Sequence, residues 1–347
     1  MQAAKETLKE TAGMTIDQAQ PTRRGALATF GAGVALAAAG PSLALTPALA
    51  AVPPATKQAP AFYRNKVGDI QLTIVNDGAR TMPLPDTFVR NVTKAEVESA
   101  LGAAYVPTGK LTVPYNPILL NSGGKLALVD TGNGQGDAKG EVGHLLPNLA
   151  AAGIDPKQLD MVIITHFHGD HILGLRMADG SLTFPNAEVK VPAAEWAFWM
   201  NDENMAKAPD AMKGAFALVR RIFKDLGDRL TPYEMDKDLL PGVTPFATVG
   251  HTPGHTSLAI QSGNERLLLQ ADVTNIPALF LRNPGWHVMF DMDAQKAEET
   301  RRRFYDRASA DKVLVAGFHF PFPALGHVEK DGANNFRLVP VAWNPVL

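Results

Sequence analysis

Cysteine is absent from this chain of 347 residues. Its absence excludes disulfide bonds and thiolate ligands, so a metal site would have to be built from histidine, aspartate and glutamate. A strong net charge is also missing, because the formal net charge is −2 and the sequence pI is about 6.5. Without a basic surface the sequence predicts no nucleic-acid partner. Hydrophobic residues make up 46% of the chain, which is ordinary for a globular protein with a sizeable core.

Residues 1–51 differ from the rest of the chain. Arg23 and Arg24 precede an apolar run that ends at Gly40-Pro41, and Ala48-Leu49-Ala50 follows. A positive region, a short apolar run and an Ala-x-Ala site are the parts of a secretory signal, and the paired arginines favour the twin-arginine type. A retained anchor is the alternative, but the apolar run has only about 15 residues where a membrane span needs ~20. We therefore expect residues 1–51 to be cleaved on export to the periplasm, which leaves no stable membrane insertion.

The remaining chain divides into a Pro- and Ala-rich linker or N-terminal strap, residues 52–66, and one folded domain, residues 67–347. Short apolar runs closed by turn residues predict buried strands at 70–75, 118–120, 126–129, 161–164, 189–191, 258–260, 267–269 and 313–316. Helical periodicity predicts helices at 94–101, 142–152, 193–201, 211–226 and 294–308. Since strands and helices occur in both halves, we expect an α/β fold in which helices cover sheets.

One short segment concentrates potential metal ligands. Thr165-His166-Phe167-His168-Gly169-Asp170-His171 directly follows the predicted strand 161–164. His166 and His168 lie two residues apart, so in extended chain their imidazoles point the same way. Gly169 lets the backbone turn, which brings Asp170 and His171 back toward the first pair. A polar surface loop is the alternative, but three histidines and an aspartate packed so closely indicate a metal-binding loop.

Other imidazoles and carboxylates come where further predicted strands end. Asp130 follows the strand 126–129, Asp272 follows the strand 267–269, and His319 follows the strand 313–316. Two more histidines lie in the loop Gly250-His251-Thr252-Pro253-Gly254-His255. Each strand end would place an imidazole or a carboxylate on the edge of a sheet.

Taken together, these residues resemble the ligand pattern of the metallo-β-lactamase superfamily. His166-x-His168-x-Asp170-His171 matches its main motif, and Val129-Asp130-Thr131-Gly132 resembles its upstream signature. The resemblance implies a four-layer αββα metallo-β-lactamase sandwich with two metal ions at one edge. The implied ligands are His166, His168 and His255 for the first ion, Asp170, His171 and His319 for the second, and Asp272 as the bridge.

A closer resemblance is to the methyl parathion hydrolase branch, which includes aryl-ester and lactone hydrolases. Ala61-Phe62-Tyr63-Arg64, Phe184-Pro185-Asn186-Ala187 and especially His319-Phe320-Pro321-Phe322-Pro323 carry it. The chain departs from that branch around Phe167 and from Asn275 to Asp291, so the substrate does not transfer from it.

Two further groups of residues are expected around the ions. The ligands would be oriented through hydrogen bonds, as is usual in metal sites, by Asp130, His251 and His327. The pocket for the substrate would be walled by Phe167, Trp199, Asn275, Phe280, Trp286 and His287.

Ligands of this kind, without thiolate, favour zinc, with manganese, cobalt and iron chemically admissible. Two such ions would supply a metal-bound hydroxide, with Asp170 and Asp272 as the catalytic carboxylates. An apolar pocket favours neutral hydrophobic esters, lactones or organophosphate triesters as small-molecule substrates.

The sequence leaves several alternatives open. His168 argues against a di-iron oxidase of the superfamily, and the lack of cysteine argues against its two-metal β-lactamases. An N-acyl-homoserine lactonase is a further alternative, although such enzymes commonly carry tyrosine three residues after the bridging aspartate, where this chain has Asn275. From a different class, a non-catalytic periplasmic metal-binding protein would show the same ligands. A homodimer is compatible with the sequence.

Overall fold

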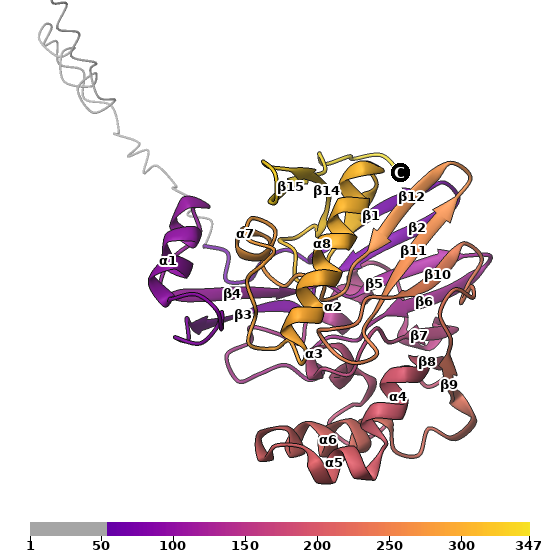
Figure 1. Ribbon diagram of the computed structural model, residues 1–347. Helices are drawn as coiled ribbons and strands as arrows, with labels where there is room; N and C mark the ends of the chain where they lie inside the picture. Colours follow the sequence, from indigo (N-terminus) through magenta and orange to yellow (C-terminus); the bar gives the residue numbers. More distant parts are fainter. Residues whose placement is uncertain (1–53) are drawn as a thin grey trace, which may run out of the picture. The chain divides into compact units, whose positions relative to one another are not determined.

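The computed structural model describes residues 54–347, so the predicted signal at residues 1–51 lies outside the described residues (Figure 1). Within residues 54–347, no helix has the length and apolar character that crossing a bilayer requires. From Thr56 to Leu347 the chain forms one compact unit.

Two β-sheets form the centre of this unit. The first has seven strands in the order β1-β2-β5-β6-β7-β8-β9, and the second has six strands in the order β10-β11-β12-β13-β14-β15. The strands of the first sheet are β1 (Phe62–Val67), β2 (Ile70–Val75), β5 (Ile118–Ser122), β6 (Lys125–Val129), β7 (Met161–Ile163), β8 (Glu188–Pro192) and β9 (Leu230–Tyr233). Those of the second are β10 (Val243–Ala247), β11 (Thr256–Ser262), β12 (Glu265–Leu269), β13 (Leu314–Ala316), β14 (Leu325–Lys330) and β15 (Phe336–Pro340). A separate hairpin pairs β3 (Gly78–Pro83) with β4 (Lys110–Tyr115).

Helices cover the outer faces of both sheets, as Figure 1 shows for α8 in front of the second sheet. The α-helices of the described residues are α1 (Lys94–Ala103), α2 (Leu145–Ala151), α3 (Gly169–Ile172), α4 (Ala193–Trp199), α5 (Asp202–Lys207), α6 (Asp210–Phe223), α7 (Pro277–Phe280) and α8 (Ala294–Ala310). Of these, α1 and α7 pack with the β3–β4 hairpin in a separate apolar cluster. Leu72 of the first sheet and Leu258 of the second share the core between the sheets. Leu149 of α2 and Val219 of α6 pack on the other face of the first sheet. The four-layer αββα sandwich is therefore confirmed.

The two halves of the chain repeat one arrangement. In the first half β5 and β6 form a hairpin and β6 runs parallel to β7. In the second half β11 and β12 form a hairpin and β12 runs parallel to β13. Parallel neighbours end at the same edge of a sheet, where ligands are usually bound in α/β folds. This topology brings the loops after β6, β7, β12 and β13 to one end of each sheet.

All the strands expected from apolar runs are present, but the expected boundary of the strap at residue 66 is wrong. Residues 62–66 belong to β1, which pairs with β2 from Phe62 opposite Val75 to Val67 opposite Ile70. β1 is an edge strand whose residues are mostly half-buried. Because such a strand needs no continuous apolar run, the hydrophobic pattern did not reveal it.

Candidate metal centre

The histidine-rich loop after β7 turns as its glycine predicts. His168 is extended, with φ −68° and ψ 152°, and caps the short helix α3, which begins at Gly169. The helical turn carries Asp170 and His171 to the side on which His166 and His168 lie. One loop thus supplies side chains to three overlapping groups of ligand atoms. The first is His166, His168 and His251, the second is Asp170, His171 and His319, and the third, with Asp272, shares His166 with the first and His171 with the second.

These groups combine side chains that are distant in the sequence. In the first, His168 Nδ1 lies 3.2 Å from His166 Nε2 and 2.9 Å from His251 Nε2. In the second, His319 Nε2 lies 3.4 Å from Asp170 Oδ2. The full set of side chains that could hold metal ions is His166, His168, Asp170, His171, His251, Asp272 and His319.

Asp272 lies between the first and the second group. Its Oδ2 is 3.3 Å from His251 Nε2 and 3.1 Å from His319 Nε2, and its Oδ1 is 3.3 Å from His171 Nε2. The preceding residue, Ala271, has a φ of +50°, a left-handed conformation that costs energy for a residue with a Cβ. The backbone therefore accepts strain where it presents the one carboxylate that contacts both groups.

The sequence-based assignment of His255 as a ligand, with His251 beside it as an orienting residue, is corrected by the structure. His255 Nδ1 lies 2.9 Å from the Thr248 carbonyl oxygen, and Nε2 accepts a hydrogen bond of 3.0 Å from the Asp272 N–H. Burial, together with the nearby His251, lowers the pKa of His255 to about 3, so its imidazole stays neutral and can accept that bond. Both ring nitrogens are occupied, whereas His251 directs Nε2 into the first group.

Hydrogen bonds from Nδ1 orient three of the histidines. His171 Nδ1 lies 2.8 Å from Asp130 Oδ2, and His251 Nδ1 lies 2.8 Å from Asp291 Oδ1. His319 Nδ1 lies 2.8 Å from the Pro114 carbonyl oxygen. Acceptors in these places hold Nδ1–H and leave Nε2 as the electron-pair donor, as is usual around protein-bound metals.

Glu195 of α4 is a functional candidate that the sequence analysis missed. Its fully buried Oε1 accepts hydrogen bonds from the Phe167 N–H at 3.1 Å and from Trp199 Nε1 at 2.8 Å. Its Oε2 accepts from Thr252 Oγ1 at 2.9 Å and from the Gly254 N–H at 2.7 Å. Glu195 thus joins the His166–His171 loop to the His251–His255 loop. No local pattern around a single glutamate in a short helix indicates such a contact.

The residues fit a two-ion centre. His171 Nε2 and Asp272 Oδ1 are buried without a hydrogen-bond partner among the described residues, and they face one another. Unpaired buried polar atoms are rare and costly, and a cation between them would satisfy both. A cation would also explain why ring nitrogens of His168 and His251 approach to 2.9 Å. Five imidazoles and two carboxylates form a donor set that suits zinc.

A pocket of about 380 Å³ opens above these ligands. His168, Asp170, Asp272 and His319 lie at its base. His251, another of the ligands, also lines it. The remaining walls are apolar apart from Arg80, Asn133 and Asn275, and consist of these residues with Met82, Phe88, Val113, Tyr115, Gly169, Leu173 and Phe290. Its volume is in the range of small-molecule sites.

Of the residues expected to wall the pocket, only Asn275 does so. Phe167 points into the helix-covered core, 4.4 Å between ring centroids from Phe223, because neighbours in extended chain face opposite sides. His287 Nε2 instead contacts Glu298 Oε2 at 2.9 Å. The remaining expected residues, which pack in the apolar clusters instead, are Trp199, Phe280 and Trp286.

His327, expected to orient ligands, is exposed on β14, where it pairs with Leu314 and Val339. Sequence proximity to the His319 loop was misleading, because the turn after His319 directs the chain back along the second sheet.

Comparisons with known proteins agree with this geometry. Residues 112–319 match the family model described as the Metallo-beta-lactamase superfamily. The chain is 29% identical over 197 residues to the N-acyl homoserine lactonase AiiA of Bacillus thuringiensis subsp. kurstaki, covering 51% of this chain and 71% of that one. Among solved structures it resembles the hydrolase AbOPH, with a TM-score of 0.76, 28% identity, and coverage of 83% of this chain and 100% of that chain. It also resembles AidC, a dizinc quorum-quenching lactonase, with a TM-score of 0.76, 27% identity, and coverage of 82% and 99%.

Proposed function

Because the chain belongs to the metallo-β-lactamase superfamily and is a metal-dependent hydrolase, we propose that it hydrolyses neutral, hydrophobic esters, lactones or organophosphate triesters. One observation carries this proposal. A cluster of imidazole and carboxylate ligands lies at the base of a pocket whose walls include Met82, Val113, Leu173 and Phe290. Such walls stabilise an uncharged acyl or aryl group better than a charged metabolite.

We assign two ions to this site and zinc as their identity. His166, His168 and His251 would hold one ion, while Asp170, His171 and His319 would hold the other, with Asp272 shared. The chemistry supplied by a pair of divalent ions in such a site is a lower pKa for water and polarisation of the acyl or phosphoryl oxygen. Support for zinc comes from the donor set and from the dizinc relative AidC.

Two side chains in the pocket are placed to act on the substrate. The Asp170 side chain is 24% exposed, and its carboxylate can receive the proton that the attacking water loses. The Tyr115 hydroxyl forms no hydrogen bond within the described part of the chain, although the residue is only 6% exposed. Burial, with Asp170 nearby, raises the pKa of Tyr115 above its usual range, so the hydroxyl keeps its proton. It can donate a hydrogen bond to the substrate oxygen that gains negative charge.

An N-acyl-homoserine lactonase is the second candidate, and a specific comparison favours it. AidC, similar over most of both chains, was solved in complex with the product N-hexanoyl-L-homoserine. In this chain, however, Asn275 donates from Nδ2 to Asp272 Oδ2 at 3.1 Å. One of its amide hydrogens is therefore used by Asp272. This hydrogen bond restricts the orientation in which Asn275 could donate to a lactone carbonyl. We rank aryl esters, simple lactones and phosphotriesters above acyl-homoserine lactones.

The test compares kcat/KM of the zinc-loaded protein on a nitrophenyl ester, dihydrocoumarin, methyl parathion and a long-chain N-acyl-homoserine lactone. We expect two metal equivalents per chain, turnover of at least one of the first three substrates, and loss of turnover when a chelator removes the metal. If the acyl-homoserine lactone is preferred by more than about tenfold, or about 1.4 kcal/mol, the second candidate is correct. Metal uptake without turnover of any substrate would instead identify a binding protein.

A further inference from the structure

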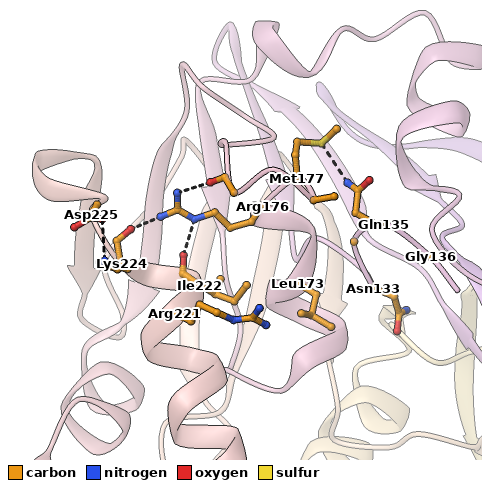
Figure 2. A pocket seen from close by; sticks show the side chains of 13 residues that line it. Asn133, Gln135, Gly136, Leu173, Arg176, Met177, Arg221, Ile222, Lys224 and Asp225 are labelled. Atoms are coloured by element: carbon orange, nitrogen blue, oxygen red, sulfur yellow. Dashed lines mark hydrogen bonds and ion pairs between the residues drawn. The ribbon is translucent and has the colours of Figure 1, made fainter.

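A second pocket, of about 440 Å³, has the lining that Figure 2 shows. It lies next to the pocket above the ligands. The two pockets share Asn133 and Leu173 in their walls. Three segments line the second pocket: the loop after β6 at residues 133–136, the segment from Leu173 to Gly180, and the end of α6 as far as Asp225. The shared Asn133 and Leu173 place the second pocket beside the space above the ligands.

Positive charge gathers in this second pocket. Arg176, Arg221 and Lys224 line it, against the single carboxylate of Asp225. The Arg176 guanidinium donates hydrogen bonds to the carbonyl oxygens of Ile222, Gly180 and Lys224, and these bonds connect two walls of the pocket (Figure 2). Arg176 forms no ion pair with a carboxylate within residues 54–347.

The cations of α6 that lie outside the second pocket are paired with carboxylates. Lys213 pairs with Asp210 at 2.7 Å, and Arg220 pairs with Asp202 at 2.7 Å. Arg221 forms no ion pair in the described part of the chain, and Lys224 has only the neighbouring, exposed Asp225 at 3.8 Å. Basic residues at a helix C-terminus are favoured by the helix dipole. The same effect engages Arg176 from another segment, because it donates to the Ile222 and Lys224 carbonyl oxygens at that helix end. Arg221 and Lys224 are therefore the cations that remain available to a ligand.

The same pocket also has an apolar side. Leu173, Met177 and Ile222 line it beside the cations. A hydrocarbon chain can lie along these side chains while an anionic group at its end meets the guanidinium and ammonium groups.

We propose that this pocket binds the part of the substrate remote from the bond that is cleaved, and that it takes an apolar chain ending in a carboxylate. The inference rests on the proposed hydrolase function and changes its substrate class in one respect, because the substrate as a whole carries a carboxylate remote from the neutral ester. The reacting ester stays neutral in the pocket above the ligands, and the anionic end lies beyond Leu173.

Two nitrophenyl esters of equal chain length test the proposal: nitrophenyl octanoate and the mono-nitrophenyl ester of octanedioic acid. The zinc-loaded wild type should have a lower KM for the anionic ester, and added salt should reduce this preference. In the double variant Arg221→Gln/Lys224→Gln, KM for the anionic ester should rise about fivefold or more with kcat unchanged. KM for the neutral ester should stay constant. Lys213→Gln on the same helix, outside the pocket, is the matched control and should change neither value.

Equal KM values for the two esters in the wild type, or a preference that survives in the double variant, would overturn this inference while leaving the proposed function standing. If the wild type turns over neither ester but hydrolyses dihydrocoumarin or methyl parathion, the inference fails and the proposed function stands. If it turns over none of these substrates, both fail.

Discussion

The backbone N–H of Phe167 donates a hydrogen bond to Glu195 Oε1 across 3.1 Å. The other oxygen of the same carboxylate accepts from Thr252 and Gly254 in the loop that carries His251. The approach is close, since a Cβ on Gly254 would lie 2.2 Å from the backbone nitrogen of Glu195. A buried anion with four donors thus fixes the distance between the two loops that supply the first group of ligands.

Glu195→Gln should weaken metal binding as well as the fold. The amide nitrogen cannot accept a hydrogen bond, so two of the four buried donors lose their acceptor at about 1–3 kcal/mol each. We expect a matching fall in the free energy of unfolding of the metal-free protein and a loss of metal affinity of about 10–100-fold. Competition with a chromophoric chelator measures the affinity.

Trp199→Phe is the control for this prediction, because it removes one donor and some core volume but leaves the bonds to both loops. It should destabilise the protein while metal affinity stays within about twofold of wild type. If both variants lose metal affinity equally, Glu195 acts only through general stability.

His251→Ala and His255→Ala should differ in metal stoichiometry. Removing His251 takes a nitrogen from the first group, so we expect the dialysed variant to retain one metal equivalent in elemental analysis. Removing His255 deletes the acceptor of the Asp272 N–H and the contact with Thr248, but it takes no nitrogen from either group of ligands. That variant should bind both equivalents with about 10–100-fold lower affinity. If His255→Ala loses one metal equivalent and His251→Ala keeps both, His255 is the ligand, as the sequence predicted.

Tyr115→Phe should lower kcat and leave KM nearly unchanged. The ring keeps its packing against His319, while the donor to the charged oxygen of the transition state is lost. Removing one such donor costs about 10²–10³-fold in kcat.

Tyr233→Phe provides the matched control, since the Tyr233 hydroxyl donates to the Ile164 carbonyl oxygen and lies outside the pocket. It should lower stability and spare kcat. A Tyr115→Phe enzyme with wild-type kcat on every substrate would show that Tyr115 lines the pocket and that its hydroxyl takes no part in the reaction.

We propose export through the twin-arginine signal, which concerns residues outside the described part of the chain. Replacing Arg23 and Arg24 by lysine should retain the protein in the cytoplasm of a bacterial host. The unaltered chain should be recovered from the periplasm with an N-terminus near Ala51. Recovery of a periplasmic protein that still starts at Met1 would contradict the proposed cleavage.

The sequence by itself determined the fold class and most of the ligands. His166, His168, Asp170 and His171 are close in the chain, so a strand followed by a glycine turn suffices to bring them together. Asp272 and His319 each follow a short apolar run that could be read as a buried strand. A ligand can be predicted from its local sequence pattern wherever the geometry of a strand or turn sets the direction of the side chain.

Only the tertiary structure decided between His251 and His255, because two histidines four residues apart in one loop carry the same local signal. The choice depends on Asp291, which reaches Nδ1 of His251 from another segment. Tertiary packing also turned Phe167 into the core and brought Tyr115 of β4 into the pocket. These contacts join residues far apart in the chain, and the hydrophobic pattern of each segment holds no information about its distant partner.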